Sequence, residues 1–133
     1  MYQTNSAAYR EMEVRSASPG QLLVIVFDHL LVSLRRARLS MESRNIELRV
    51  ATLAKCRAAL EELLGSLDFE KGGPLAKDLS ALYTFLLTEL VDLGMRPDVA
   101  KLDRITGMVS ELRDAFAQAS TQVGAQPAVA AGR

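Results

Sequence analysis

Two side chains in this 133-residue sequence are suited to nucleophilic or metal chemistry, the single histidine His29 and the single cysteine Cys56. A zinc site needs several such ligands, and a nucleophile needs a base held beside it. His29 lies in a predicted helix and is expected to be half exposed, while Cys56 lies on the apolar side of another helix. We therefore expect a solvated histidine and a small buried hydrophobic residue, with no catalytic residues, no metal and no cofactor.

The acidic side chains and the one glycine pair do not form a recognisable site either. Asp28, Glu89 and Asp92 do not match the Glu-x-x-His pattern with which helical bundles hold metals. Gly72-Gly73 lacks the Lys-Ser/Thr that completes a phosphate-binding loop, and no strand precedes it. A plain turn is the better interpretation of the glycine pair.

A short basic cluster, Arg35-Arg36 with Arg38, lies on the first predicted helix. A solvated helix face explains it, and contact with a phosphate group is the alternative. Over the whole chain, 16 Lys and Arg residues balance 16 Asp and Glu residues, so the formal net charge is zero. Proteins that bind nucleic acids or anionic membranes usually carry a basic surplus or patch. We therefore expect no nucleic-acid partner.

The composition favours a single all-α domain. Hydrophobic residues make up 49% of the chain and aromatic residues only 5%, and most of the apolar residues are the helix formers Leu and Ala. The chain has no apolar run of 18 residues, and its polar N-terminus lacks the apolar core of a signal peptide. A soluble, cytoplasmic protein without membrane insertion is the expectation.

Helix start and stop signals divide the chain into four blocks of similar length. Ser18-Pro19 with Gln21 forms a capping box, and Asp98 caps the last block. Glycine-containing stops, among them Gly94, separate the blocks. Helices are predicted over residues 18–41, 45–65, 74–94 and 98–120, after a flexible N-terminal segment (1–17) and before a disordered tail (121–133). Short connections between helices of equal length favour an antiparallel up-down four-helix bundle.

The core of this bundle is predicted from apolar residues spaced three, four or seven positions apart. The first two helices contribute Leu23, Val26, Phe27, Leu30, Leu34 and Met41, then Ile46, Val50, Leu53, Leu60, Leu64 and Leu67. The last two contribute Leu75, Leu79, Leu82, Leu86, Leu90 and Leu93, then Leu102, Ile105, Val109, Leu112 and Phe116.

Several large apolar residues fall outside these core stripes. Ile25, Val32 and Leu39 repeat every seven residues on the first helix, and Ile25 lies about 160° from Leu23 at 100° per residue. The other off-core residues are Phe85 on one flank of the third helix, Leu87 and Val91 on its other flank, and Met108 on the fourth helix. Such residues lower solubility unless the N-terminal segment, a second copy or a partner covers them. The alternative for the first helix is a wide buried arc.

Two segments, 16–42 and 66–98, carry a more specific pattern. A Ser-Pro helix start precedes an apolar run that ends in an aromatic-Asp pair. A Leu-Asp…Gly-Gly loop and a Leu-Tyr-aromatic motif follow, and an Asp-Ala-aromatic triplet closes the fourth helix. The residues are Ser18-Pro19, Phe27-Asp28, Leu67-Asp68, Gly72-Gly73, Leu82-Tyr83 with Phe85, Asp114-Ala115-Phe116, and Tyr9 ahead of the proline. In order and spacing this pattern resembles the flagellin-specific export chaperone family of the FliS type, over about residues 9–120.

The resemblance implies a cytoplasmic bundle that binds the disordered C-terminal segment of flagellin. It would prevent premature polymerisation of flagellin and assist its delivery to the flagellar type III export apparatus, with an export-gate component as a second partner. The N-terminal segment would cover part of the client surface. The predicted client-binding residues are Tyr9, Val14, Ile25, Val32, Leu39, Phe85, Leu87, Val91 and Met108. Departures from the family pattern at His29, Thr88-Glu89 and Phe116 bear on client preference.

Two other functions are open from the residues alone. A helical dimer would use the Ile25, Val32 and Leu39 stripe as a self-association seam, as a structural or adaptor protein does. A ligand-binding or enzymatic bundle would need polar groups in its core, and only Arg57 lies near a core stripe. For the chaperone, which needs no enzymatic activity, we expect a monomer or a weak homodimer.

Overall fold

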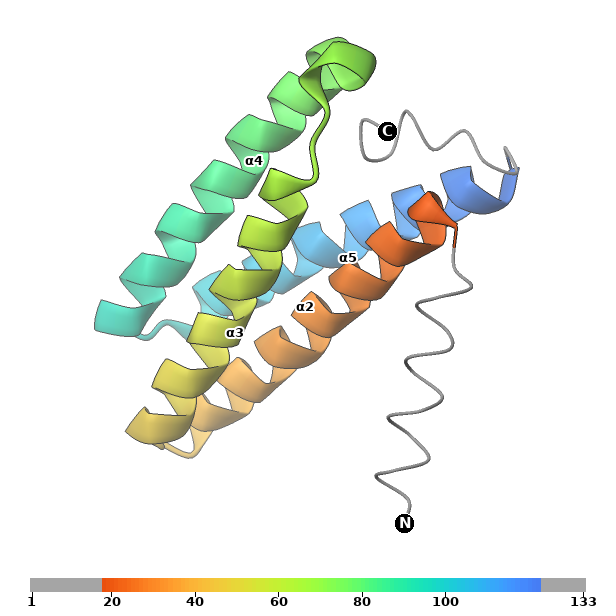
Figure 1. Ribbon diagram of the computed structural model, residues 1–133. Helices are drawn as coiled ribbons and strands as arrows, with labels where there is room; N and C mark the ends of the chain where they lie inside the picture. The colour runs from red at the N-terminus through yellow and green to blue at the C-terminus, as the bar shows by residue number, and fades with distance from the viewer. Residues whose placement is uncertain (1–17, 123–133) are drawn as a thin grey trace.

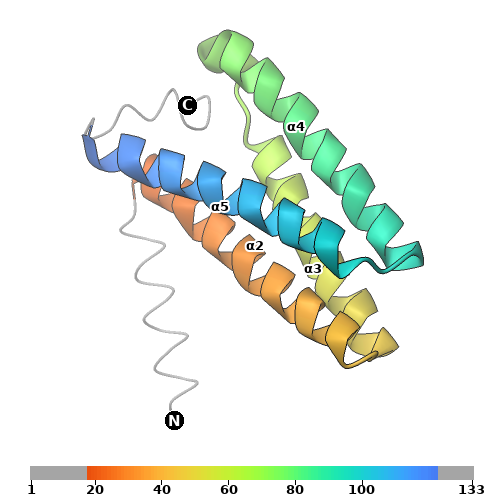
Figure 2. The same cartoon turned by 180° about the vertical axis from the view of Figure 1, so that it is seen from behind.

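The computed structural model describes residues 18–122, and in this range the chain forms four long helices. They are α2 (Pro19–Glu42), α3 (Ile46–Gly65), α4 (Phe69–Met95) and α5 (Val99–Gln122). Consecutive helices run in opposite directions, and α5 returns alongside α2 (Figures 1 and 2). The predicted all-α, antiparallel four-helix bundle is confirmed. The segment 1–17 and the tail from residue 123 lie outside the described residues.

Side-chain caps fix where the helices begin. The Ser18 hydroxyl accepts a hydrogen bond from the Gln21 backbone N–H at 3.2 Å, and the Gln21 side chain accepts one from the Ser18 N–H at 2.8 Å. This reciprocal pair is the predicted capping box. Asn45 and Asp98 cap α3 and α5, because each accepts a hydrogen bond from the backbone N–H three residues later. The start of each of these helices is therefore determined locally.

α4 begins earlier than the predicted start at residue 74. Asp68 accepts hydrogen bonds from two backbone N–H groups of the next turn, so a helical turn starts at Phe69. Gly73 then interrupts it with φ 52° and ψ −132°, a conformation that favours glycine. The regular helix resumes at Pro74, where the sequence predicted its start.

The two C-terminal helices end later than predicted. α4 passes through Gly94 to Met95, and α5 reaches Gln122 rather than residue 120. Gly94 is therefore a helix residue and not the stop. The helix ends where Arg96 takes the non-helical angles φ −132° and ψ 89°. Arg96 directly precedes a proline, which disfavours helical geometry in the residue before it.

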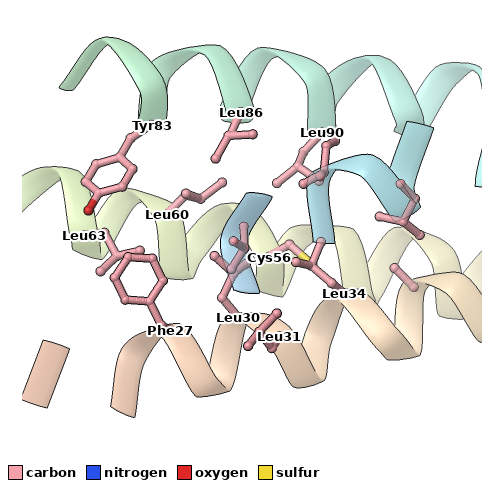
Figure 3. Close-up of a cluster of buried hydrophobic side chains, with 14 of the residues drawn as sticks. Phe27, Leu30, Leu31, Leu34, Cys56, Leu60, Leu63, Tyr83, Leu86 and Leu90 are labelled. Atoms are coloured by element: carbon pink, nitrogen blue, oxygen red, sulfur yellow. The ribbon is translucent and has the colours of Figure 1, made fainter. Parts of the chain in front are cut away.

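The core lies between the α2–α5 pair and the α3–α4 pair. Figure 3 shows Leu60 and Leu63 of α3 between side chains of α2 and α4. The buried apolar residues that form this core cluster are Leu23, Phe27, Leu30, Leu31, Leu34, Ala37, Leu53, Cys56, Leu60, Leu63, Leu79, Tyr83, Leu86, Leu90, Leu93, Leu102, Ile105, Val109 and Phe116. Val26, Met41, Leu64, Leu67, Leu82 and Leu112 are only partly buried and pack against this core.

Three predicted core residues are exposed. Ile46 and Val50 are 63% and 58% exposed, and Leu75 is 37% exposed. Apolar residues surround α3, so their spacing alone does not select the stripe that faces its neighbours. Packing places Cys56 and Leu63 inward instead. The core assignment of Ile46 and Val50 on α3 was therefore wrong, and so was that of Leu75 on α4.

Candidate functional site

The side chains that could act as nucleophiles or metal ligands are either buried in the core or exposed singly. Cys56 is enclosed in the core, and burial raises the pKa of its thiol to about 12, so the nucleophilic thiolate is disfavoured. His29 is exposed on α2. Among residues 18–122, no three His, Cys, Asp or Glu side chains are grouped so that they could hold a metal ion. A functional site in the described residues is therefore to be sought among the exposed surfaces that could bind a partner.

The burial of Cys56 leads to a testable expectation. Cys56→Ala should keep its helical circular dichroism and its binding partners, and should lower the free energy of unfolding by roughly 1–2 kcal/mol, as for a small cavity. In the folded wild-type protein the thiol should resist alkylation at pH 8 until denaturant is added. Chemical denaturation and mass spectrometry of the alkylated protein measure both effects. Loss of binding in a folded Cys56→Ala protein would contradict a purely structural role.

The acidic residues that the sequence singled out are engaged in ion pairs between helices. Lys101 Nζ of α5 lies 2.7 Å from an Asp92 oxygen and 3.0 Å from a Glu89 oxygen of α4. Hydrogen bonds from Lys101 and Arg96 hold the pKa of Asp92 below its usual value. Asp28 of α2 accepts a hydrogen bond from Arg113 of α5 at 2.9 Å. These carboxylates therefore connect helices.

Motif residues from opposite ends of the chain meet between α2 and α5. The rings of Phe27 and Phe116 stack with centroids 5.6 Å apart and planes inclined by 22°. Next to them lies the Asp28–Arg113 pair. The aromatic-Asp motif of α2 and the closing Asp-Ala-aromatic triplet of α5 thus form one contact that joins these two helices, with Phe116 as its second ring.

The outward side of α2 carries the first group of exposed apolar residues. Val32 is 41% exposed and Leu39 58%, while Ile25 is partly buried. The exposure of Val32 and Leu39 contradicts the alternative that α2 has a wide buried arc. Leu22, which is not among the predicted site residues, is 36% exposed and continues the group toward the start of the helix. It was hidden in the continuous apolar run 22–27, where no period distinguishes one face from another.

The two flanks of α4 carry the second group. Phe85 is 51% exposed and lies one turn before Glu89, which contacts Lys101 of α5, so Phe85 is on the flank toward α5. Val91 is 49% exposed and lies three residues before Gly94, whose carbonyl accepts a hydrogen bond from Arg49 of α3 at 3.4 Å. Val91 is therefore on the flank toward α3.

The remaining predicted site residues are less accessible or lie elsewhere. Leu87 and Met108 are partly buried and pack against the core. Tyr9 and Val14 lie outside the described residues. α2 packs mainly on α3 and α5, whereas α4 packs mainly on α3. The α2 group and the α4 group therefore lie on different sides of the bundle, and the structure does not bring them together into one patch.

An apolar pocket of about 270 Å³ lies where the start of α2 faces the end of α3. The two helix pairs diverge toward this end of the bundle (Figure 1). The lining residues are Pro19, Leu22, Leu23, Val26, Glu62, Leu63 and Ser66. The pocket could not be predicted from the sequence, because it depends on how far α2 and α3 separate. Leu22 belongs both to the pocket and to the exposed group on α2.

None of the helices within residues 18–122 is both long and apolar enough to cross a membrane.

Comparison with known proteins gives a consistent set of relatives. The family described as Flagellar protein FliS matches residues 1–123. A flagellar secretion chaperone FliS from Salmonella typhimurium is 33% identical over 117 residues, which is 87% of each chain. One from Escherichia coli is 33% identical over 107 residues, 80% of this chain and 79% of the relative. One from Bacillus subtilis is 28% identical over 112 residues, 84% of this chain and 83% of the relative.

Proposed function

Because the chain belongs to the FliS family of flagellar secretion chaperones, we propose that it is a cytoplasmic chaperone that binds the disordered C-terminal segment of flagellin. Binding keeps this segment from polymerising and allows flagellin to be delivered to an export-gate component. The observation that best supports the proposal is the row of exposed large apolar side chains on α2, which includes Val32 and Leu39, outside an otherwise well-packed core.

The energetics suit a chaperone that must release its client. An amphipathic segment lays its apolar face on an apolar surface, and burying a large aliphatic side chain contributes about 1.5–3 kcal/mol. The client is disordered beforehand, and ordering it costs about 2–5 kcal/mol of the gross interaction energy. Binding is therefore reversible. While bound, the apolar stripe of the client is occupied and cannot pair with another flagellin.

The exposed apolar residues of α2 and α4 lie on different sides of the bundle, which limits how one client can contact them all. Phe85 and Val91 lie on opposite flanks of α4, and both are remote from the α2 group. A client that contacts all of them must wrap around the bundle. Phe85→Asp and Val91→Asp test this separately, because both side chains are about half exposed and their replacement should spare the fold. Loss of binding in both variants supports wrapping, whereas loss in only one supports a single surface.

Affinity capture from flagellated cells tests the proposed function. The tagged full-length chain is used as bait, and flagellin is identified in the eluate by mass spectrometry. Flagellin should be enriched, and an excess of its free C-terminal segment should displace it. Absence of flagellin from the eluate of a folded bait would contradict the proposal.

We also propose that residues 1–17, through Tyr9 and Val14, shield part of the client surface when no client is bound. Deleting residues 1–15 leaves the capping box at Ser18 intact, so the bundle should remain folded. The deletion is expected to raise client affinity or to cause self-association of the free protein, because apolar surface is uncovered. Binding titrations and analytical ultracentrifugation measure the two effects. Unchanged affinity together with unchanged oligomeric state would rule out shielding.

A further inference from the structure

The outward face of α2 has the spacing of a coiled-coil seam. Six residues separated alternately by three and four positions form what we call the α2 row: Leu22, Ile25, His29, Val32, Arg36 and Leu39. All are exposed except Ile25, which is partly buried. A repeat of 3.5 residues is the pattern with which one helix packs along another. The row is about 26 Å long at 1.5 Å per residue.

The row carries positive charge that no described carboxylate neutralises. Arg36 occupies a seam position, and Arg35 lies beside it. The nearest carboxylates along α2 are already engaged, since Asp28 pairs with Arg113 and Glu42 pairs with Arg38. Among residues 18–122, neither Arg35 nor Arg36 takes part in an ion pair. Polar residues at seam positions select the partner and its register, so the complementary helix should present carboxylates here.

The row leads directly into the apolar pocket. A helix with 3.6 residues per turn drifts by about 20° for each seven-residue repeat. The row therefore slants around α2, and its first member, Leu22, lines the pocket beside α3. The pocket opens to the surface and its lining is mainly apolar, so it can accept an apolar side chain of a partner. Glu62 is among its lining residues. Glu62 and Arg36 thus place opposite charges at the two ends of one surface.

These charges select a direction for the partner helix. The N-terminal end of a helix carries partial positive charge and the C-terminal end partial negative charge. The N-terminal end of the partner is favoured near Glu62, and its C-terminal end near Arg36. The partner should therefore run parallel to α2, with an apolar anchor near its N-terminal end in the pocket.

A second copy of this chain fits the row poorly. In a parallel pair, Arg36 would face Arg36. In the in-register antiparallel pair, Arg36 would face Ile25 and His29 would face Val32. Neither arrangement supplies a carboxylate. The charge pattern favours a different, acidic helix.

We propose that the α2 row and the pocket form one continuous docking surface for an amphipathic helix of the client. This helix has apolar residues at alternating spacings of three and four, carboxylates opposite Arg35 and Arg36, and an apolar anchor in the pocket. The inference rests on the proposed function, because it specifies which chemistry of the flagellin segment binds here and in which direction.

The probe for this inference is the fluorescently labelled C-terminal segment of the flagellin from the same organism, titrated with the full-length chain. Leu22→Asp and Arg36→Glu are each expected to weaken binding at least tenfold. Their matched controls are Leu75→Asp, a leucine of similar exposure on α4, and Arg104→Glu, an exposed arginine on α5. Both controls should stay within about twofold of wild type. Circular dichroism shows that each variant is folded.

A charge-reversed probe separates recognition from a structural effect. A flagellin segment with Lys in place of its acidic residues should bind Arg36→Glu more tightly than it binds wild type. The Arg36→Glu defect should also shrink as salt is added, because salt screens exposed charges.

Each other result overturns the inference in a recognisable way. If wild type binds the segment and both Leu22→Asp and Arg36→Glu bind it equally well, the client lies elsewhere and the proposed function stands. If wild type does not bind the segment, the proposed function fails with it. If Arg36→Glu instead abolishes a dimer in sedimentation, or binding to vesicles of anionic lipid, the occupant is a second copy or a membrane rather than an acidic helix.

Discussion

Replacing Phe27 with Ala is expected to lower the free energy of unfolding by about 3–5 kcal/mol, the range found for a buried aromatic side chain. Phe27 is completely buried, and its ring stacks on Phe116 at 5.6 Å. The change therefore leaves a cavity at the contact that joins α2 to α5. Because domains of this size are stable by only about 5–15 kcal/mol, the loss should be large in urea denaturation followed by circular dichroism.

The neighbouring ion pair provides the control. Asp28→Asn removes the charge that Arg113 contacts at 2.9 Å, but both side chains are substantially exposed to solvent. Solvent-exposed ion pairs contribute about 1 kcal/mol or less. Asp28→Asn should therefore be several times less destabilising than Phe27→Ala. Equal losses in the two variants would show that the charge pair contributes as much to stability as the buried ring, which would contradict this expectation.

Replacing Val32 with Asp is expected to reduce client affinity by about tenfold to a hundredfold. Burial of such a side chain against a partner contributes about 1.5–3 kcal/mol, and about 1.4 kcal/mol corresponds to a tenfold change in affinity. Val32 is 41% exposed in the free protein, so the fold should survive the added charge. Fluorescence titration with the flagellin segment measures the affinity, and circular dichroism measures the helix content.

Val32→Thr is the matched control, because it nearly preserves the shape of the side chain without adding charge. It should bind the client more tightly than Val32→Asp. If Val32→Asp unfolds the protein, the side chain supports the bundle despite its exposure. If neither fold nor affinity changes, the client lies elsewhere, and the surface of α5 around Met108 is the next candidate.

The elements with local causes were predictable from the sequence. The capping box at Ser18 fixes the start of α2 through hydrogen bonds within four residues, and Asp98 fixes the start of α5 in the same way. The position of a glycine predicted the end of a helix less well. Gly94 lies inside α4, because the backbone restriction imposed by the following Arg96-Pro97 pair ends the helix instead.

The buried face of a helix could be predicted from the sequence only where one side of the helix is apolar and the opposite side is polar. In α5 the predicted stripe from Leu102 to Phe116 is buried, apart from the partly buried Leu112. In α3 apolar residues lie all round, so Ile46 and Val50 were assigned to the core although they are exposed. Which face turns inward depends on contacts with helices distant in the sequence.

In the candidate site, too, features set by local sequence were predictable and features set by tertiary packing were not. The exposure of Val32 and Leu39 could be predicted, because they lie opposite a well-defined core stripe. The pocket was missed because it arises from the separation between α2 and α3. Its member Leu22 was also missed, because it stands in an unbroken apolar run. The extent of a surface between two helices depends on their tertiary arrangement.

Isothermal titration calorimetry with purified flagellin tests the central claim most directly. Full-length flagellin and flagellin without its C-terminal segment are titrated separately with the full-length chain, and the polymerisation of each mixture is followed by light scattering. If the protein is a flagellin export chaperone, full-length flagellin should give a saturable complex that does not polymerise, and the truncated flagellin should give no heat of binding. Equal binding of both flagellins, or polymerisation at the same rate with and without the chain, would contradict the proposed function.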